Sequence, residues 1–333
     1  MSCSKPLVDA FNRRVTYLRL SVTDRCDLRC SYCMPEKMQF LPRKEVLSLE
    51  ELHKLALAMI DRGISKIRLT GGEPLVRRDM IELVRALGRK LGDGLEELTL
   101  TTNGTQLAQF ADDLAAAGVK RINVSLDTLD AGLFEQLSRR DRLGQVLEGI
   151  AAAGEAGLKV KLNTVALKGL NEAEIPLLVE WAHAHDHEMT LIEVMPLGEV
   201  EGQRVDHYLP LTAVKDALEA RWTLTASEHR SGGPARYYDV AETGGRLGMI
   251  TPLTNNFCAT CNRIRVTATG ELYACLGGAE KVDLRAALRS ETPDTNLALA
   301  LDEAMRIKPE RHHFRIEAGS GPAQPRHMSL TGG

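Results

Sequence analysis

Seven cysteines are the residues in this sequence most able to do chemistry. Six of them fall into two groups of three, Cys26, Cys30 and Cys33, and Cys258, Cys261 and Cys275, while Cys3 stands alone. An odd count argues against a disulfide framework, and such close spacing gathers thiolates around an electrophilic centre. Three thiolates can hold a cubane iron–sulfur cluster and leave one iron open to a small molecule. Zinc completed by a nearby His or Asp stays the alternative, above all for the second group.

The elements that must position these cysteines alternate between strands and helices over the first two thirds of the chain. β-Branched and apolar runs predict six strands, over Val15–Val22, Ile64–Leu69, Leu95–Thr101, Val119–Leu126, Leu158–Val165 and Glu188–Met195. Ser48 and Glu51 form a capping box that predicts the start of one intervening helix. Parallel strands need a helical crossover between them, so this alternation predicts the βα repeat of a parallel sheet.

Polar and glycine-rich residues follow the predicted strands at the point where each strand ends. Cysteines follow the first strand, Gly71-Gly72-Glu73-Pro74 the second and Asn103-Gly104 the third. This is the layout of the active face of a (β/α) barrel. Six units rather than eight predict an α/β fold, an incomplete (β/α)6 TIM-type barrel. We therefore divide the chain into a partial barrel, residues 1–196, and a C-terminal α+β extension, residues 197–333, which closes the open side and ends in a flexible Gly-Gly tail.

The composition excludes several classes of protein. The chain has 333 residues, of which 44% are hydrophobic and 26% are charged, with a formal net charge of -3. Collagen-like and disordered chains do not have this balance, and near-neutral charge gives no global attraction to nucleic acid or anionic membranes. Apolar runs stay well short of the ~20 residues that a membrane helix needs. We expect a cytoplasmic globular protein with neither a membrane nor a nucleic-acid partner.

The spacing of the first three cysteines, Cys26-x-x-x-Cys30-x-x-Cys33, is highly characteristic when the residue before the last cysteine is aromatic, as Tyr32 is here. This motif resembles the signature of the radical S-adenosylmethionine (SAM) superfamily. The resemblance implies that the three thiolates hold a [4Fe-4S] cluster whose open iron is chelated by SAM. A low-potential electron then splits the sulfonium and releases a 5′-deoxyadenosyl radical.

The same resemblance implies which residues contact SAM. Tyr32 and Met195 match the adenine contacts, Ser125 matches a ribose contact, and Gly72 matches the seat of the methionine amino group. A plain turn stays the alternative for the glycine pair at this position. Asp127 either orients SAM or caps the helix that follows it.

The second cysteine group carries a narrower resemblance. Phe257–Arg265 with Cys275, the block Arg19–Cys26 and the terminal Gly332-Gly333 resemble the GTP 3′,8-cyclase family of molybdenum cofactor biosynthesis over nearly the whole chain. The resemblance implies a second [4Fe-4S] cluster that faces the guanine of GTP, and a di-glycine end that reaches into the active site. It implies a GTP site formed by Arg19, Arg68, Thr101, Lys161, Arg263, Ile264 and Arg265, of which Arg19, Arg263 and Arg265 are catalytic. A triphosphate of about four negative charges needs several cations, and arginine makes bidentate phosphate contacts.

The family resemblance also implies a reaction and partners. The radical takes the C3′ hydrogen of GTP, C3′ bonds to guanine C8, and one further electron and proton give 3′,8-cyclo-7,8-dihydro-GTP. An external one-electron donor supplies electrons, a downstream cyclic pyranopterin synthase takes the product, and a homodimer stays open. Many relatives place an arginine where this chain has Thr190, so no triphosphate role is assigned to that residue. The alternatives are a radical SAM enzyme that acts on a peptide and a zinc-binding interaction protein.

Overall fold

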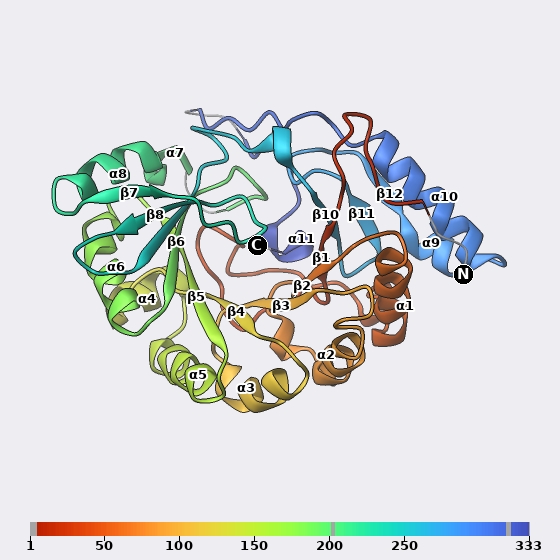
Figure 1. Cartoon of the computed structure of the whole chain (residues 1–333), viewed down its shortest axis with the longest axis horizontal. Helices are drawn as coiled ribbons and strands as arrows, with labels where there is room; N and C mark the ends of the chain where they lie inside the picture. The colour runs from red at the N-terminus through yellow and green to blue at the C-terminus, as the bar shows by residue number, and fades with distance from the viewer. Residues whose placement is uncertain (1–4, 201–203, 318–320, 333) are drawn as a thin grey trace.

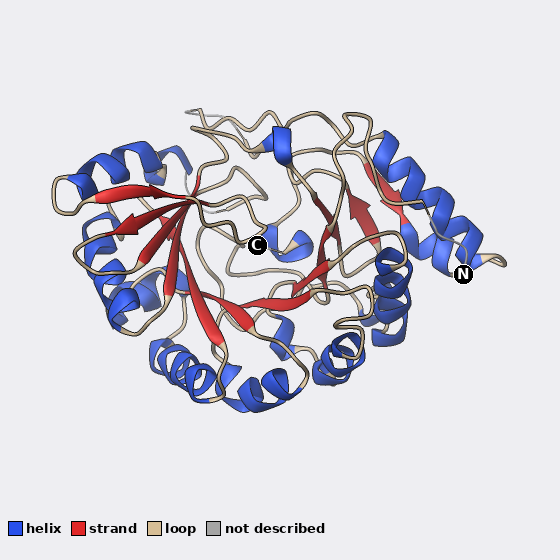
Figure 2. Ribbon diagram, viewed as in Figure 1, coloured by secondary structure: helices blue, strands red, loops and turns tan. Residues whose placement is uncertain are grey.

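A curved sheet of twelve strands surrounds the centre of the molecule, with most helices on its outer side (Figures 1 and 2). The computed structural model describes residues 5–200, 204–317 and 321–332. The strands are β1 Tyr17–Ser21, β2 Lys66–Thr70, β3 Glu97–Thr102, β4 Arg121–Ser125, β5 Lys159–Ala166, β6 Glu188–Glu193, β7 Leu224–Ser227, β8 Arg236–Val240, β9 Arg246–Ile250, β10 Arg263–Val266, β11 Glu271–Tyr273 and β12 Lys281–Asp283. Each of the six strands predicted from the βα repeat is present, with ends that differ by a few residues.

The α-helices of the described residues follow the strands of the repeat and then continue in the C-terminal third. They are α1 Leu49–Ile60, α2 Met80–Gly88, α3 Leu107–Ala116, α4 Ala131–Ser138, α5 Leu143–Glu155, α6 Ile175–Ala184, α7 Arg204–His207, α8 Leu211–Glu219, α9 Leu284–Leu288, α10 Pro293–Arg306 and α11 Met328–Thr331. The predicted capping box at the start of α1 is confirmed. The Ser48 hydroxyl accepts from the Glu51 N–H at 3.1 Å, and the Glu51 carboxylate accepts from the Ser48 N–H at 2.8 Å.

The strand order is β12-β11-β10-β1-β2-β3-β4-β5-β6-β9-β8-β7. Strands β10 through β9 in this order are all parallel, and an antiparallel pair continues the sheet at each edge. The α/β partial barrel is therefore as expected, but the C-terminal region adds strands to both of its edges rather than only covering the gap. The sequence did not predict this, because neither β9 nor β10 is introduced by the regular helix that marks a βα unit.

Alternation along the strands gives the barrel an apolar outer face and a polar inner face. Leu18 and Ile67 point to the outer side, where they are fully buried in the core beneath the helices. Their neighbours Arg19 and Arg68 point to the opposite face of the same strands and line a cavity inside the barrel. A strand with both faces buried usually reads as a continuous apolar run. In these strands the residues that face inward, which are every second residue, are polar instead. The interior is therefore built to hold a polar ligand.

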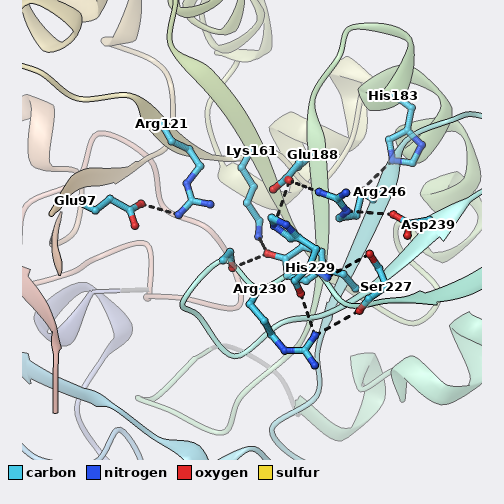
Figure 3. Close-up of polar contacts among 12 residues, drawn as sticks. Glu97, Arg121, Lys161, His183, Glu188, Ser227, His229, Arg230, Asp239 and Arg246 are labelled. Carbon is cyan, nitrogen blue, oxygen red and sulfur yellow. Dashed lines mark hydrogen bonds and ion pairs between the residues drawn. The ribbon is translucent and has the colours of Figure 1, made fainter. Parts of the chain in front are cut away.

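Ion pairs close the inner face at the amino ends of the strands (Figure 3). The first residue of β3, Glu97, lies 2.7 Å from Lys66 and 2.6 Å from Arg121, the first residue of β4. The first residue of β6, Glu188, lies 3.2 Å from Arg246, the first residue of β9. These carboxylates offset the positive charge at this end of the barrel only.

The C-terminal segment lies inside the ring of strands, where α11 and the C-terminus occupy the middle of the view in Figure 1. The sequence analysis expects a flexible tail here, yet Ser329, Thr331 and Gly332 are buried. The Arg265 guanidinium donates to the carbonyl oxygens of Thr331, at 3.2 Å, and Gly332. Arg265 binds the backbone of this segment rather than its side chains, since the buried hydroxyl oxygens of Ser329 and Thr331 have no partner among the described residues, and hydrophobic patterning does not reveal such a contact. Gly333 and Cys3 lie outside the described residues.

A membrane-spanning helix would need a long apolar run, and none of the helices in the described ranges has one.

One buried carboxylate joins the barrel to the C-terminal region. Glu193, at the end of β6, is fully buried and accepts from the backbone N–H groups of Leu211 (3.3 Å), Leu253 (2.9 Å) and Thr254 (3.2 Å). It also accepts from the Thr254 hydroxyl at 2.5 Å. A single side chain therefore satisfies donors from two segments that follow the repeat.

We predict that Glu193→Ala lowers the free energy of unfolding by about 3 kcal/mol, because one buried and two partly buried N–H groups lose their acceptor. Urea unfolding of the anaerobically purified protein measures it. The matched control is Glu180→Ala, which removes a surface ion pair with Arg221 and should change the value by at most about 0.5 kcal/mol. Equal effects of the two substitutions would contradict this role of Glu193.

Candidate active site

Two adjoining cavities lie inside the barrel, each lined by one group of three cysteines. The first cavity contains every residue expected to contact the first cluster or SAM, namely Cys26, Cys30, Cys33, Tyr32, Gly72, Ser125 and Met195. The second contains Cys258, Cys261, Cys275, Arg19, Arg68, Lys161, Arg263, Ile264 and Arg265. Asn163, Ile192 and Met195 line both cavities. The two sites that the sequence separates by more than two hundred residues therefore share a wall.

The glycine pair after β2 allows two backbone segments to pack against each other. A Cβ added to Gly71 would lie 2.3 Å from the Thr23 carbonyl oxygen, and one added to Gly72 would lie 2.3 Å from that of Arg25. Gly71 has φ +149°, and the Gly72 N–H donates to the Thr23 carbonyl at 2.8 Å. The pair is therefore needed to hold the loop against the segment that leads into the cysteines.

Two carboxylates hold the loops around the first cavity together. Glu73 is fully buried and accepts from the Thr102 hydroxyl at 2.8 Å and from the Asn103 N–H at 2.5 Å. Burial raises the pKa of Glu73 to about 7, although these hydrogen bonds act in the opposite direction. Asp27 accepts from the Asn103 amide at 2.7 Å and from the Thr105 hydroxyl at 2.6 Å. The loops after β1, β2 and β3 thus form one hydrogen-bonded unit.

Asp127 binds Tyr32 rather than capping a helix. Its carboxylate accepts from the Tyr32 hydroxyl at 2.6 Å and from the Val165 N–H at 2.8 Å. The N-cap of α4 is instead Asp130, which accepts from the Leu133 N–H at 2.7 Å. Of the two roles that the sequence left open for Asp127, helix capping is wrong. The carboxylate fixes the aromatic ring of Tyr32 in the wall of the first cavity.

The first cysteine group has a donor set that fits an iron–sulfur cluster. Burial raises the pKa of Cys26 and Cys30, and their mutual proximity with Cys33 raises the pKa of Cys30 further. No lysine or arginine is among the residues that line this cavity in the described part of the chain. These thiols therefore become thiolates only when a cationic centre binds among them, which is what a cluster supplies.

The second cysteine group is built with protein cations beside it. Burial raises the pKa of Cys261, but Lys308 and Arg263 outweigh burial and bring it to about 7. The Lys308 ammonium lies 3.7 Å from the Cys261 sulfur and donates to the carbonyl oxygens of Arg263 and Ala274 at 2.8 and 2.5 Å. Lys308 thus fixes Cys261 against β10. Among the described residues, no three His, Cys, Asp or Glu side chains form a group that could hold a single metal ion.

Five cations of the second cavity have no carboxylate partner among the described residues: Arg19, Arg68 and Lys161, which are buried, and Arg263 and Arg265, which are partly buried. Within the described part of the chain, none of them forms an ion pair. Two nitrogens of Arg19 and one of Arg68 have no hydrogen-bond partner at all. Burial lowers the pKa of Arg19 to about 10 and that of Lys161 to about 7. Unpaired buried charge of one sign is costly, so the cavity favours a ligand with several negative charges.

Two of the residues singled out from the sequence lie apart from this set. Thr101 lines the first cavity, although its hydroxyl accepts from Arg68 at 3.3 Å. Thr190 is buried on β6, and its hydroxyl oxygen has no partner among the described residues. A Cβ added to Gly248 would lie 2.8 Å from that oxygen and 3.0 Å from the ring of Tyr237. Tyr237 therefore occupies the space beside Thr190.

Several residues in or directly behind the wall of the second cavity were not predicted from the sequence. Tyr17 and Asn123 are buried and line the cavity. The Lys66 ammonium lies 4.9 Å from the ring centroid of Tyr17, and the buried Tyr237 contacts Lys161. Alternation could have found Lys66, because it is two residues before Arg68 on the same strand and shares its face. No comparable signal marks Tyr237, which comes from the C-terminal region and lies beside Lys161 only through the β6–β9–β8 pairing.

Comparisons with known proteins agree with this arrangement. Residues 20–182 match the family model "Radical SAM superfamily", and residues 187–314 match "Molybdenum Cofactor Synthesis C". Two solved structures share the fold: Streptococcus suis SuiB bound to S-adenosylmethionine (TM-score 0.62, 17% identity, 91% of this chain and 68% of that one) and native anSMEcpe with bound AdoMet (TM-score 0.57, 16% identity, 85% and 83%).

Two sequence relatives carry the assignment further, and both have the name GTP 3′,8-cyclase. That of Erythrobacter litoralis is 72% identical, over 98% of this chain and 98% of its own. That of Rhizobium meliloti is 59% identical, over 98% of this chain and 95% of its own. Identity at this level over nearly the full length of both proteins establishes common family membership. The chain belongs to the GTP 3′,8-cyclase family, within the radical SAM superfamily.

Proposed function

We propose that this protein is a GTP 3′,8-cyclase, a lyase that makes 3′,8-cyclo-7,8-dihydro-GTP for molybdenum cofactor biosynthesis. The observation that carries the proposal is the pair of adjoining cavities, each lined by three cysteines, of which only the second is, among the described residues, also lined by lysine and arginine, five in all. A nucleoside triphosphate bound across the shared wall would match both the charge and the two cysteine groups. Family membership supports the same activity.

The first cavity holds a [4Fe-4S] cluster on Cys26, Cys30 and Cys33, with SAM against Tyr32, Gly72, Ser125 and Met195. When bound, the cluster and SAM supply a 5′-deoxyadenosyl radical that takes the C3′ hydrogen of the GTP ribose. The Asp127 carboxylate keeps the Tyr32 ring in place through its 2.6 Å hydrogen bond. The loop unit centred on Glu73 keeps Gly72 against the cysteine segment.

The second cavity holds GTP and a second [4Fe-4S] cluster on Cys258, Cys261 and Cys275, which faces the guanine. Arg19, Arg68, Lys161, Arg263 and Arg265 bind the triphosphate, while Ile264 packs against the nucleotide and Thr101 orients Arg68. These positively charged groups would fix the nucleotide so that C3′ faces the first cavity and C8 stays within bonding reach of C3′. The buried walls exclude water from the substrate radical.

The finer architecture and the partners belong to the same proposal. We take residues 1–196 as a (β/α)6 barrel and residues 197–333 as the region that completes the substrate site. An external one-electron donor reduces the first cluster, and a downstream cyclic pyranopterin synthase takes the product. We place the protein in the cytoplasm, where thiols stay reduced, with a homodimer as its assembly.

Two triple variants test the function and the division between the cavities. Anaerobic wild-type protein with SAM, reductant and GTP should form 5′-deoxyadenosine and consume GTP. The variant with Ala at Cys26, Cys30 and Cys33 should form no 5′-deoxyadenosine and consume no GTP. The variant with Ala at Cys258, Cys261 and Cys275 should keep about four irons per chain, the content of one cubane, and leave GTP unconsumed. Loss of all iron from the second variant would show that the two sites are not independent.

We predict that GTP affinity depends on the charge of Lys161. Because burial lowers its pKa to about 7, the ammonium form is present below pH 7 and is lost as the pH rises above it. Bound triphosphate favours the charged form, so the Kd for GTP should rise by about tenfold between pH 6.5 and 8.5. Calorimetry on the anaerobic holoprotein measures this. In the control Lys161→Arg, which stays charged, the rise should be absent, and an equal rise in both proteins would contradict the assignment.

We predict that Gly332→Ala stops cyclisation. The added methyl would lie 2.0 Å from the Thr70 side chain, at a backbone φ of +73° that favours glycine, so the tail must leave its contact with Arg265. The rate of product formation should fall by at least about tenfold, the loss expected when a charge-assisted hydrogen bond is removed. Iron content should be unchanged. In the matched control Gly321→Ala the methyl meets no atom within 4 Å, and its rate should stay at the wild-type value. A normal rate in Gly332→Ala would show that the tail is dispensable.

A further inference from the structure

Tyr237 places a phenol from the C-terminal region beside the cation-rich second cavity, where it contacts two residues that line it, Lys161 and Ser231. It lies on β8, two strands away from the barrel strand β6, and is only 2% exposed. Its hydroxyl accepts a hydrogen bond from the Lys161 ammonium and donates one to the Ser231 hydroxyl at 2.7 Å. The Lys161 ammonium also lies 4.7 Å from the centroid of the Tyr237 ring. The hydroxyl and the ring of Tyr237, both uncharged, thus fix the position of the Lys161 ammonium.

Ser231 links the same phenol to a second cation. Its backbone carbonyl accepts from the Lys66 ammonium at 2.8 Å, while its hydroxyl accepts from Tyr237. Ser231, Gly233, Pro234 and Ala235 belong to the loop before β8 and line the second cavity. The phenol therefore fixes the Lys161 ammonium of the cavity wall, while the same loop is hydrogen-bonded to Lys66, whose charge is paired with Glu97 at 2.7 Å.

Neither contact neutralises Lys161. Glu188 is the carboxylate whose charge acts on Lys161, and it forms an ion pair with Arg246 at 3.2 Å (Figure 3). Among the described residues, the Tyr237 oxygen is the one hydrogen-bond partner of the Lys161 ammonium. An ammonium has three N–H groups, so two of them stay available to an anion in the cavity.

We propose that Tyr237 is a positioning residue that holds Lys161 in the geometry that binds the polyphosphate chain of the substrate. This inference rests on the proposed function and adds the residue that preorganises its phosphate site. A lysine side chain loses up to about 2 kcal/mol of rotamer entropy when it is fixed. The phenol fixes the side chain before the substrate arrives, so less of the phosphate-binding energy is lost on ordering it.

The test compares Tyr237→Phe with Tyr238→Phe in the anaerobic holoenzyme. The first variant removes the hydroxyl and keeps the ring, while the control alters the adjacent, half-buried tyrosine, whose ring faces Lys215. We expect the Kd and KM for GTP to rise about tenfold in Tyr237→Phe, the usual effect of losing a hydrogen bond to a charged group, with kcat within about twofold. Binding of guanosine, which has no phosphate, should be unchanged, and so should iron content. The control should match wild type for both ligands.

A second background shows whether the hydroxyl acts through Lys161. In Lys161→Met, the further change Tyr237→Phe should weaken GTP binding by less than about twofold, because residues that act as a unit are not additive. If Tyr237→Phe does not fold, Ser231→Ala replaces it, since it removes one partner of the phenol and keeps the carbonyl that holds Lys66.

Three results would overturn the inference: wild-type GTP affinity in the variant, an equal loss for guanosine, or a full tenfold loss in the Lys161→Met background. Failure of the proposed function has a different signature. In that case the wild-type holoenzyme would bind GTP and leave it unconverted, while the comparison of dissociation constants would still decide the role of Tyr237.

Discussion

The burial of positive charge without carboxylate partners inside the barrel is the constraint on which the rest of the structure depends. On the inner faces of β1, β2, β5 and β10, Arg19, Arg68 and Lys161 are buried and Arg263 and Arg265 are partly buried, and removal from water without a partner is unfavourable for a charged group. The fold tolerates them because apolar residues fill the other face of the same strands and the helices cover that face. The stability of the sheet is thus supplied on its outer side, which leaves the inner side for binding.

The charge is distributed along the strands in a way that directs a ligand. At the amino ends, Glu97 and Glu188 pair with Lys66, Arg121 and Arg246, so that layer is largely neutral. Of the unpaired cations, Arg19, Arg68 and Arg265 lie two residues further along the strands than Lys66, and all five line the cavity of the second cysteine group, which shares a wall with the first cavity. A polyanion entering the barrel is therefore drawn between the two cysteine groups.

The parts of this arrangement that are local in sequence could be predicted from it. The cysteine spacing, the βα repeat and the turn Gly71-Gly72 each combine a short motif with a physical reason for it. The parts that depend on pairing between distant segments could not be predicted. Tyr237 approaches Lys161 across 76 residues of sequence, and β10 lies beside β1 only because the chain returns to the opposite edge of the sheet. Lys66 is an intermediate case. Strand alternation places it on the same face as Arg68, so its inward position could have been predicted from the sequence.

The central claim is that the substrate spans both cavities, with its ribose toward the first cysteine group and its base toward the second. GTP that carries deuterium at C3′, incubated anaerobically with the holoenzyme, SAM and a reductant, tests this most directly. Mass spectrometry then reports where the label goes. The account predicts that one deuterium appears in 5′-deoxyadenosine for each GTP consumed. Unlabelled 5′-deoxyadenosine formed while GTP is consumed would contradict it.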